Sequence, residues 1–125
     1  MIELKNILLV VGGSAIGGGC RYLLSMLMQQ FNRTAFPAGT FVINTLGCFL
    51  IGIIYSLSDR HPEASQNMKI LLASGFCGGF TTFSAFAIEN LELFKNGNTF
   101  LATLYIVLSV LLGVSAAWAA SAILK

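Results

Sequence analysis

Charged residues are scarce in this sequence. Of 125 residues, seven are Lys or Arg and five are Asp or Glu, which together make up 10% of the chain. Soluble domains carry about 25% charged residues, and the mean hydropathy here is +0.82. So little charge is hard to reconcile with a water-soluble surface and predicts an integral membrane protein. The net charge of +2 is too small, and its residues too scattered, to indicate a nucleic-acid partner.

Residues that build metal and catalytic sites are also few. Cys20, Cys48 and Cys77 all lie within apolar segments, no C-x-x-C pair occurs, and His61 is the only histidine. Neither a disulfide framework nor a zinc site is credible, and we interpret the cysteines as small packing residues. No nucleophile–base set and no phosphate-binding G-x-G-x-x-G spacing is present. We therefore expect no enzymatic activity.

Apolar sequence is abundant and falls into four long stretches. At about 20 residues per span, they predict transmembrane helices at about 7–28, 36–57, 68–94 and 99–124. A signal peptide is the alternative for the first stretch, but Arg21 interrupts it and no small-residue cleavage site follows. The pair Gly13 and Gly17 forms G-x-x-x-G, which predicts close packing against another helix. We predict an all-α integral membrane protein with residues 1–125 as one channel domain.

The third span contains the most unusual stretch, GFCGGFTTFSAF at 75–86. Each of its three glycines weakens a helix by about 1 kcal/mol relative to alanine, and Thr81 and Thr82 add β-branched stiffness. In a bilayer, backbone groups released by a break must be satisfied inside the protein, by water or by an ion. Broken membrane helices mark binding sites and ion paths. We therefore predict that the third helix is broken at its centre and that the break is the working part of a transport protein.

Polar and aromatic side chains within the spans each have a structural and a functional interpretation. Asn44 is either a hydrogen bond between helices or a donor to an anion. Arg21 either extends to the membrane interface or lines a vestibule that concentrates anions. Phe83 and Phe86 are either core residues or, beside Thr82, a water-poor slot with electropositive ring edges for a small anion.

Hydroxyl and carboxyl groups extend this pattern along two helices. Tyr105 and Ser109 lie one turn apart, which puts two hydroxyls on one face of the fourth span and suggests a pore wall. Thr40 lies one turn before Asn44 on the second span. Glu89, near one end of the third span, is either an interface residue or a member of the same polar track.

The distribution of basic residues gives no preferred orientation. The side with both termini and the second loop carries Lys5, Arg60, Lys69 and Lys125, and the opposite side carries Arg21, Arg33 and Lys95. Such a balance provides almost no positive-inside bias. It suggests that chains insert both ways and pair as an antiparallel, dual-topology homodimer.

Three motifs resemble the Fluc (CrcB) family of fluoride channels. They are GGSAIGGGCRY at 12–22, GTFVINTLGCFLIG at 39–52 and GFCGGFTTFSAF at 75–86. The match covers nearly the whole chain, and the last two motifs are long and specific. The resemblance implies passive fluoride export through the bacterial cell (inner) membrane, by an antiparallel homodimer with two narrow pores.

The resemblance also implies roles for individual residues. Those that it places along the fluoride pore are Asn44, Phe83 and Phe86, with Thr82, Tyr105 and Ser109 as a hydroxyl track and Arg21 near the vestibule. It further implies a structural Na⁺ between the subunits, held by the backbone carbonyls of Gly78 and Thr81. Freed carbonyls of this kind are sound ligands for a hard cation.

Two other functions remain open from the sequence. A small four-helix, dual-topology exporter is similar in size, but such proton-coupled exporters resemble one another in an acidic residue deep in the first span, and here Glu3 lies before that span. A structural assembly subunit without a pore would also have glycine-packed helices. Packing alone could use each of the polar residues above.

Overall fold

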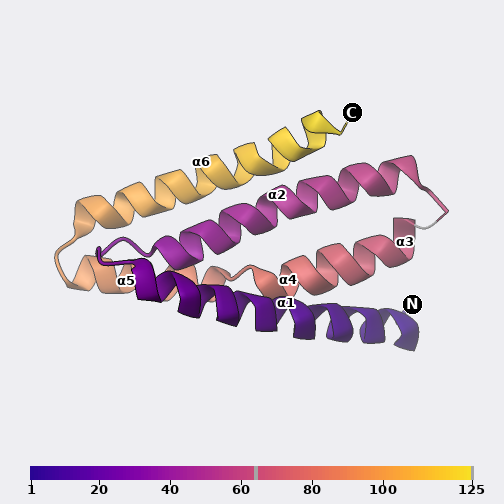
Figure 1. The fold of residues 1–125 in the computed structure, drawn as a ribbon, viewed down its shortest axis with the longest axis horizontal. Helices are drawn as coiled ribbons and strands as arrows, with labels where there is room; N and C mark the ends of the chain where they lie inside the picture. The colour runs from indigo at the N-terminus through magenta and orange to yellow at the C-terminus, as the bar shows by residue number, and fades with distance from the viewer. Residues whose placement is uncertain (64, 125) are drawn as a thin grey trace.

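Four long helical rods make up the chain (Figure 1). The computed structural model describes residues 1–63 and 65–124, and in these residues it contains helices and connecting loops but no strand. The rods are α1 (Leu4–Phe31), α2 (Ala38–Arg60), a composite third rod over Gln66–Lys95, and α6 (Thr99–Ile123). Each is long and apolar enough to cross a bilayer. The predicted all-α fold with four spans is confirmed.

The rods pack as two pairs (Figure 1). Helix α2 lies along α6, and α1 lies along the third rod. Both termini lie at one end of the molecule, and the loops that join α1 to α2 and the third rod to α6 lie at the other. The latter loop turns at Gly97, whose φ of 81° is readily adopted by glycine. The loop thus reverses the chain between the predicted third and fourth spans.

The third rod is a chain of short helical pieces. Helix α3 (Ser65–Met68) leads into the π-helical segment η1 (Lys69–Cys77), which is followed by α4 (Gly78–Phe80) and, after a gap, α5 (Phe83–Lys95). The gap is Thr81–Thr82, where φ and ψ are −86° and 158° at Thr81 and −148° and 115° at Thr82. π-helical turns are rare and frequently occur at functional sites. The predicted break near the centre of the third helix is confirmed, and it falls just after the glycines rather than at them.

Glycines let α1 approach the third rod backbone to backbone. A Cβ atom added to Gly13 would overlap the carbonyl oxygen of Leu71, and one added to Gly17 would overlap that of Phe76. A Cβ on Gly79, in α4, would lie only 2.6 Å from the Ser14 carbonyl oxygen. No larger residue fits these positions without moving a helix. The close approach predicted from the G-x-x-x-G pair is confirmed.

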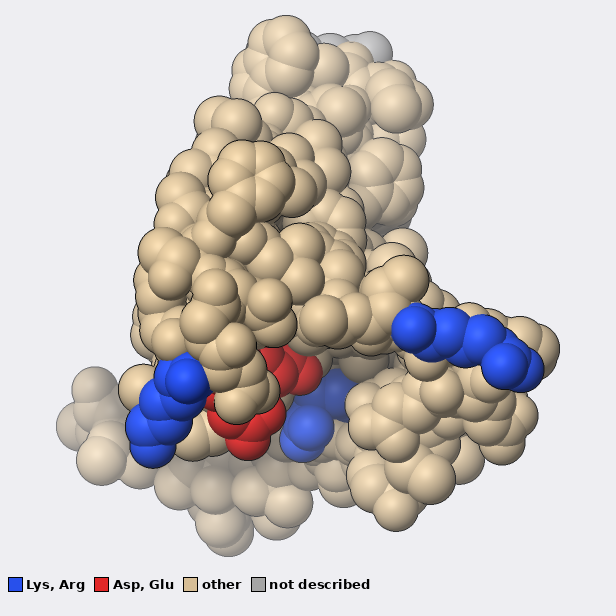
Figure 2. Space-filling view, turned by 90° about the vertical axis from the view of Figure 1, so that its left-hand side faces the viewer, with Lys and Arg blue, Asp and Glu red and all other residues tan. Residues whose placement is uncertain are grey.

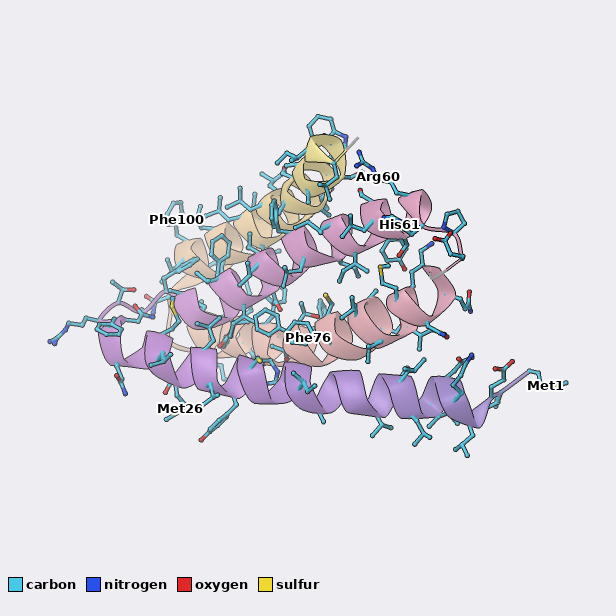
Figure 3. The ribbon with its side chains drawn as sticks, turned by 45° about the vertical axis from the view of Figure 1, so that its right-hand side comes forward. Met1, Met26, Arg60, His61, Phe76 and Phe100 are labelled. Atoms are coloured by element: carbon cyan, nitrogen blue, oxygen red, sulfur yellow. The ribbon has the colours of Figure 1, made fainter. Side chains whose placement is uncertain are left out.

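The interior holds alanine, aromatic and a few large aliphatic side chains, while many large apolar side chains are exposed. Ala102 and Tyr105 are fully buried, at 0% exposure. Phe76 lies between the helices, whereas Met26 and Phe100 point away from the bundle (Figure 3). An apolar exterior of this kind suits contact with lipid chains.

Replacing Gly17 by Val should destabilise the protein, because its side chain would be driven into the Phe76 carbonyl. Forcing extra methyl groups into a packed position costs about 1–3 kcal/mol. We expect the melting temperature of purified Gly17→Val to fall, measured as loss of the monodisperse size-exclusion peak after heating.

The matched control is Gly19→Val, on the same helix, where an added Cβ meets nothing within 4 Å. Equal melting temperatures for the two variants would contradict the packing described here.

Candidate functional site

The extended break in the third rod is held by one side chain of α2. The Asn44 Nδ2 group donates to the Thr82 carbonyl at 3.1 Å, and the Thr82 N–H donates to Asn44 Oδ1 at 2.8 Å. Asn44 therefore satisfies both backbone groups of a residue that has left the helix. In a bilayer such groups cost several kcal/mol when unpaired. Asn44 binds the break directly.

The two threonines of the break also cap the helices on either side of it. The Thr81 N–H and Oγ1 both donate to the Cys77 carbonyl at 2.9 Å, which closes the end of α4. The Thr82 Oγ1 accepts from the Ala85 N–H at 3.2 Å and lies 3.3 Å from the Ser84 hydroxyl. Thr82 is thus the N-cap of α5, a role for which threonine is well suited.

Two carbonyls at the break remain available. Among residues 1–63 and 65–124, no loop, side chain or neighbouring helix donates a hydrogen bond to the Gly78 or Thr81 carbonyl. Both residues line a cavity of about 310 Å³ between α2 and the third rod. The whole lining comprises Asn44, Gly47, Cys48, Ile51, Ala73, Cys77, Gly78, Thr81, Thr82 and Phe83. The residues that line the cavity thus include an amide, two threonines, the two residues with available carbonyls and an aromatic ring.

A second polar group joins three helices at the end of the molecule where α1 meets α2. Glu89, on α5, accepts from the Thr40 hydroxyl of α2 at 2.7 Å and from the Tyr105 hydroxyl of α6 at 2.8 Å, one bond to each carboxylate oxygen. Tyr105 is fully buried and Thr40 is 7% exposed. Each oxygen of the Glu89 carboxylate thus accepts a hydroxyl hydrogen bond from a different helix.

Aromatic rings connect this hydroxyl group to the break. Phe83 and Phe86 lie 5.6 Å apart between ring centroids, and Phe86 packs edge-on against Tyr105 at 4.9 Å. Phe83 is 79% exposed in the single chain, although it follows the break near the middle of the third span. Ser109 lies one turn beyond Tyr105 on α6 and is partly buried. Phe83, Phe86 and Tyr105 thus form a series of ring contacts that leads from the break toward Glu89.

Polar cavities open beside Glu89 at the end of the molecule. One of about 210 Å³ includes Ser25, Asn32, Thr40 and Glu89 in its lining. Another, of about 260 Å³, includes Glu89, Glu92, Asn96 and Asn98. Figure 2 views this end and shows acidic and basic side chains close together in the lower part of an otherwise uncharged face. Glu89 therefore lies where polar cavities meet the buried hydroxyl groups.

Arg21 lies at the break. Its Nε group donates to the Gly79 carbonyl at 3.1 Å, and the side chain is half-buried. About two turns earlier on α1, the Ser14 hydroxyl donates to the Gly75 carbonyl at 3.2 Å. Helix α1 therefore supplies donors to two carbonyls of the third rod. The vestibule role of Arg21 stays a prediction.

The residues predicted from the sequence occupy two groups rather than one. Asn44, Thr82 and Phe83 meet at the break, and Phe86 with Tyr105 leads away from it toward Glu89. The contacts of Thr40 and Tyr105 with Glu89 were not predicted. Their signals were present, since Thr40 shares a face with Asn44 and Glu89 is an acidic residue within an apolar span, but only the three-helix packing brings them together.

Comparison with known proteins identifies the family. The family described as "CrcB-like protein, Camphor Resistance (CrcB)" matches residues 8–121. The chain belongs to the CrcB family. Its CrcB relatives include proteins named "Fluoride-specific ion channel FluC" from three bacteria.

These relatives match the chain over most of their length. The protein from Leptospira interrogans is 47% identical over 92% of this chain and 91% of its own, and that from Azobacteroides pseudotrichonymphae is 43% identical over 90% of each. The protein from Flavobacterium psychrophilum is 39% identical over 98% of each chain. Together with the four spans, the bacterial relatives indicate a multi-pass bacterial membrane protein. The resemblance to the CrcB family seen in the sequence is confirmed.

Replacing Asn44 by Leu, which is similar in size, should destabilise the protein because both backbone groups of Thr82 lose their partner. Each buried unpaired group costs about 1–3 kcal/mol. We expect the midpoint of thermal unfolding in detergent to fall by several degrees. Thr45→Val, which changes a residue of the outer groove between α2 and α6, is the control. An unchanged midpoint in Asn44→Leu would mean that the break does not depend on Asn44.

Proposed function

We propose that this chain forms a fluoride-selective channel that lets fluoride leave the bacterial cytoplasm and so relieves fluoride toxicity. The observation that carries the proposal is the 39–47% identity, over at least nine-tenths of the chain, to proteins named fluoride-specific ion channels. The geometry of the break supports it independently, because donors and ring edges gather there. The same names support a channel rather than an enzyme.

The chemistry of the site suits a small, strongly hydrated anion. Fluoride binds water tightly, so a pore must offer hydrogen-bond donors and electropositive ring edges in exchange. Asn44 Nδ2 and the Thr82 hydroxyl supply donors beside Phe83, and Phe83 and Phe86 present their rings in sequence. Beyond Phe86, the hydroxyl groups of Tyr105 and Thr40 lead to the polar cavities at Glu89. We propose this order as the fluoride path, with Ser109 beside it.

The exposure of Phe83 supports assembly of two copies. An aromatic ring that is 79% exposed, next to an open cavity with an amide and free carbonyls, is half of a site. A second copy in the opposite orientation would cover it and complete two equivalent pores. The even distribution of basic residues agrees with such a dual-topology homodimer.

The carbonyls of Gly78 and Thr81 support a sodium site between the two copies. They are hard oxygen ligands without hydrogen-bond donors from loops, side chains or other helices in the described residues, and both residues line one cavity. Two carbonyls are too few for a sodium ion, and a second copy would supply two more. A bound Na⁺ would neutralise carbonyl dipoles at the centre of the dimer.

Passive efflux from liposomes tests the proposed function. Purified protein is reconstituted into vesicles loaded with equal fluoride and chloride, and both ions are followed with selective electrodes after dilution. We expect rapid loss of fluoride with chloride retained. Retention of fluoride by vesicles that contain monodisperse protein would refute the channel.

The other two functions predict different outcomes. A proton-coupled exporter would move its substrate only with a proton gradient, whereas the efflux proposed here needs none. A structural subunit would give no efflux at all. Neither function explains why Asn44 forms hydrogen bonds with both backbone groups of Thr82 next to an open cavity. Packing alone does not require a cavity there.

Phe83→Ile should lower the rate of fluoride efflux at least tenfold, because it removes the ring edge beside Asn44 and Thr82. Phe100→Ile is a close control, since Phe100 is 80% exposed and Phe83 is 79% exposed. Efflux is measured at equal protein density in the vesicles. Equal rates for the two variants would remove Phe83 from the path.

Gly78→Val should weaken the dimer and its sodium dependence without unfolding the chain. Within one chain, an added Cβ would lie 3.9 Å from the Ala73 carbonyl oxygen, which is ordinary contact, but it would stand in the cavity that the second copy closes. We expect a monomer on size-exclusion chromatography with light scattering. Gly12→Val, where a Cβ meets nothing within 4 Å, should remain dimeric. A sodium-dependent dimer in Gly78→Val would contradict this placement of the ion.

A further inference from the structure

The carbonyls around the break are divided between partners within the chain and the open cavity. The Cys77 carbonyl accepts from Thr81 and the Thr82 carbonyl accepts from Asn44. Between them, the Gly79 carbonyl accepts from Arg21 at 3.1 Å. The Gly78 and Thr81 carbonyls accept from no loop, side chain or neighbouring helix in the described residues.

We propose that Arg21 is a positioning residue whose Nε–H, by holding the Gly79 carbonyl against α1, leaves the Gly78 and Thr81 carbonyls for the cavity. The consequence of this bond for sodium binding rests on the proposed function. It assigns Arg21 a directional role at the break, which is distinct from attracting anions by its charge.

The packing of α1 supports a directional role. Gly17, one turn before Arg21, lies against the Phe76 carbonyl, and Gly79 lies against the backbone of Ser14. The α1 backbone therefore has a fixed position relative to the break, and the aliphatic part of the Arg21 side chain spans only a short distance to bring Nε to the Gly79 carbonyl. A guanidinium N–H also gives a charge-assisted bond, which is stronger than a neutral one.

An orienting bond at Gly79 matters because Gly79 lies in the last helical turn before the break. Helix α4 continues directly from η1 and ends at Phe80, and Thr81 and Thr82 beyond it are extended. Glycine at 79 adds conformational freedom to the peptide group that carries this carbonyl. Without a donor from α1, the Gly79 carbonyl could turn toward the cavity and compete with the Gly78 and Thr81 carbonyls for a ligand there.

Three variants separate the donor from the charge. Gln places an N–H donor at the same number of bonds from Cα as arginine Nε, without charge. Lys keeps the charge but has a methylene at that position, and Met has neither donor nor charge. Arg33→Gln, which removes a positive charge from the exposed α1–α2 loop, is the control for net charge.

The first readout is hydrogen–deuterium exchange of the dimer in nanodiscs, followed in peptides that cover residues 78–83. We expect exchange there to rise about tenfold in Arg21→Lys and Arg21→Met, the size of effect expected for loss of a charge-assisted bond. It should stay within about twofold of wild type in Arg21→Gln. Peptides from α6 should be unchanged, which distinguishes a local effect from unfolding.

The second readout is the sodium concentration at which the dimer is half-maximally stabilised against heat. This concentration should rise in Arg21→Lys and Arg21→Met and stay near the wild-type value in Arg21→Gln. If Arg21→Met does not fold, the comparison of Arg21→Gln with Arg21→Lys is sufficient to test the proposal.

Three results would overturn the proposal. If Arg21→Lys behaved like wild type in both readouts and Arg21→Gln did not, the effect would depend on charge, as a vestibule role predicts. Equal defects in Gln and Lys would show that a donor at the ε position does not suffice, and no defect in either would leave Arg21 without a role at the break. Because exchange at 78–83 needs neither sodium nor fluoride, it tests Arg21 even if the wild-type protein shows no fluoride efflux.

Discussion

The structure depends on how the chain satisfies backbone groups released in the middle of a membrane helix. Helices span bilayers because they pair all of their own N–H and C=O groups, and lipid offers no substitute. Here Thr81 and Thr82 are extended, and side chains from two neighbouring helices take over: Asn44 from α2 pairs with both groups of Thr82, and Arg21 from α1 takes the Gly79 carbonyl. A break that would be costly alone becomes a fixed and polar part of the fold.

The break organises the rest of the molecule. Helices α1 and α2 both pack against the third rod, which brings Arg21 and Asn44 to it, and glycines at 13 and 17 allow α1 to come close enough. The Gly78 and Thr81 carbonyls accept no hydrogen bond from these neighbours, and both residues line the cavity that Phe83 borders. From there, Phe86 and Tyr105 connect to Glu89, whose two oxygens bind hydroxyls of two further helices. The path proposed for fluoride therefore runs along the helix contacts that hold the bundle together.

Much of this could be predicted from the sequence, because its strongest signals are local. Low charge and four apolar stretches fix the spans, and glycines beside two threonines mark the break. Asn44 stands out because an amide in an apolar span needs a partner. The contacts of Glu89 with Thr40 and Tyr105 join residues 49 and 16 positions away, so no periodicity indicates them. Likewise, the Arg21 side chain reaches Gly79 across 58 positions, and a charge in a span does not reveal which carbonyl it will bind.

The central claim is that the break conducts fluoride selectively. The most direct measurement is the zero-current potential of the reconstituted protein in a planar bilayer, with a fluoride gradient across the membrane and equal chloride on both sides. A potential that follows the equilibrium potential of fluoride as the gradient is varied is the predicted result. A conducting protein whose zero-current potential stays at zero, or shifts instead with a chloride gradient, would contradict it.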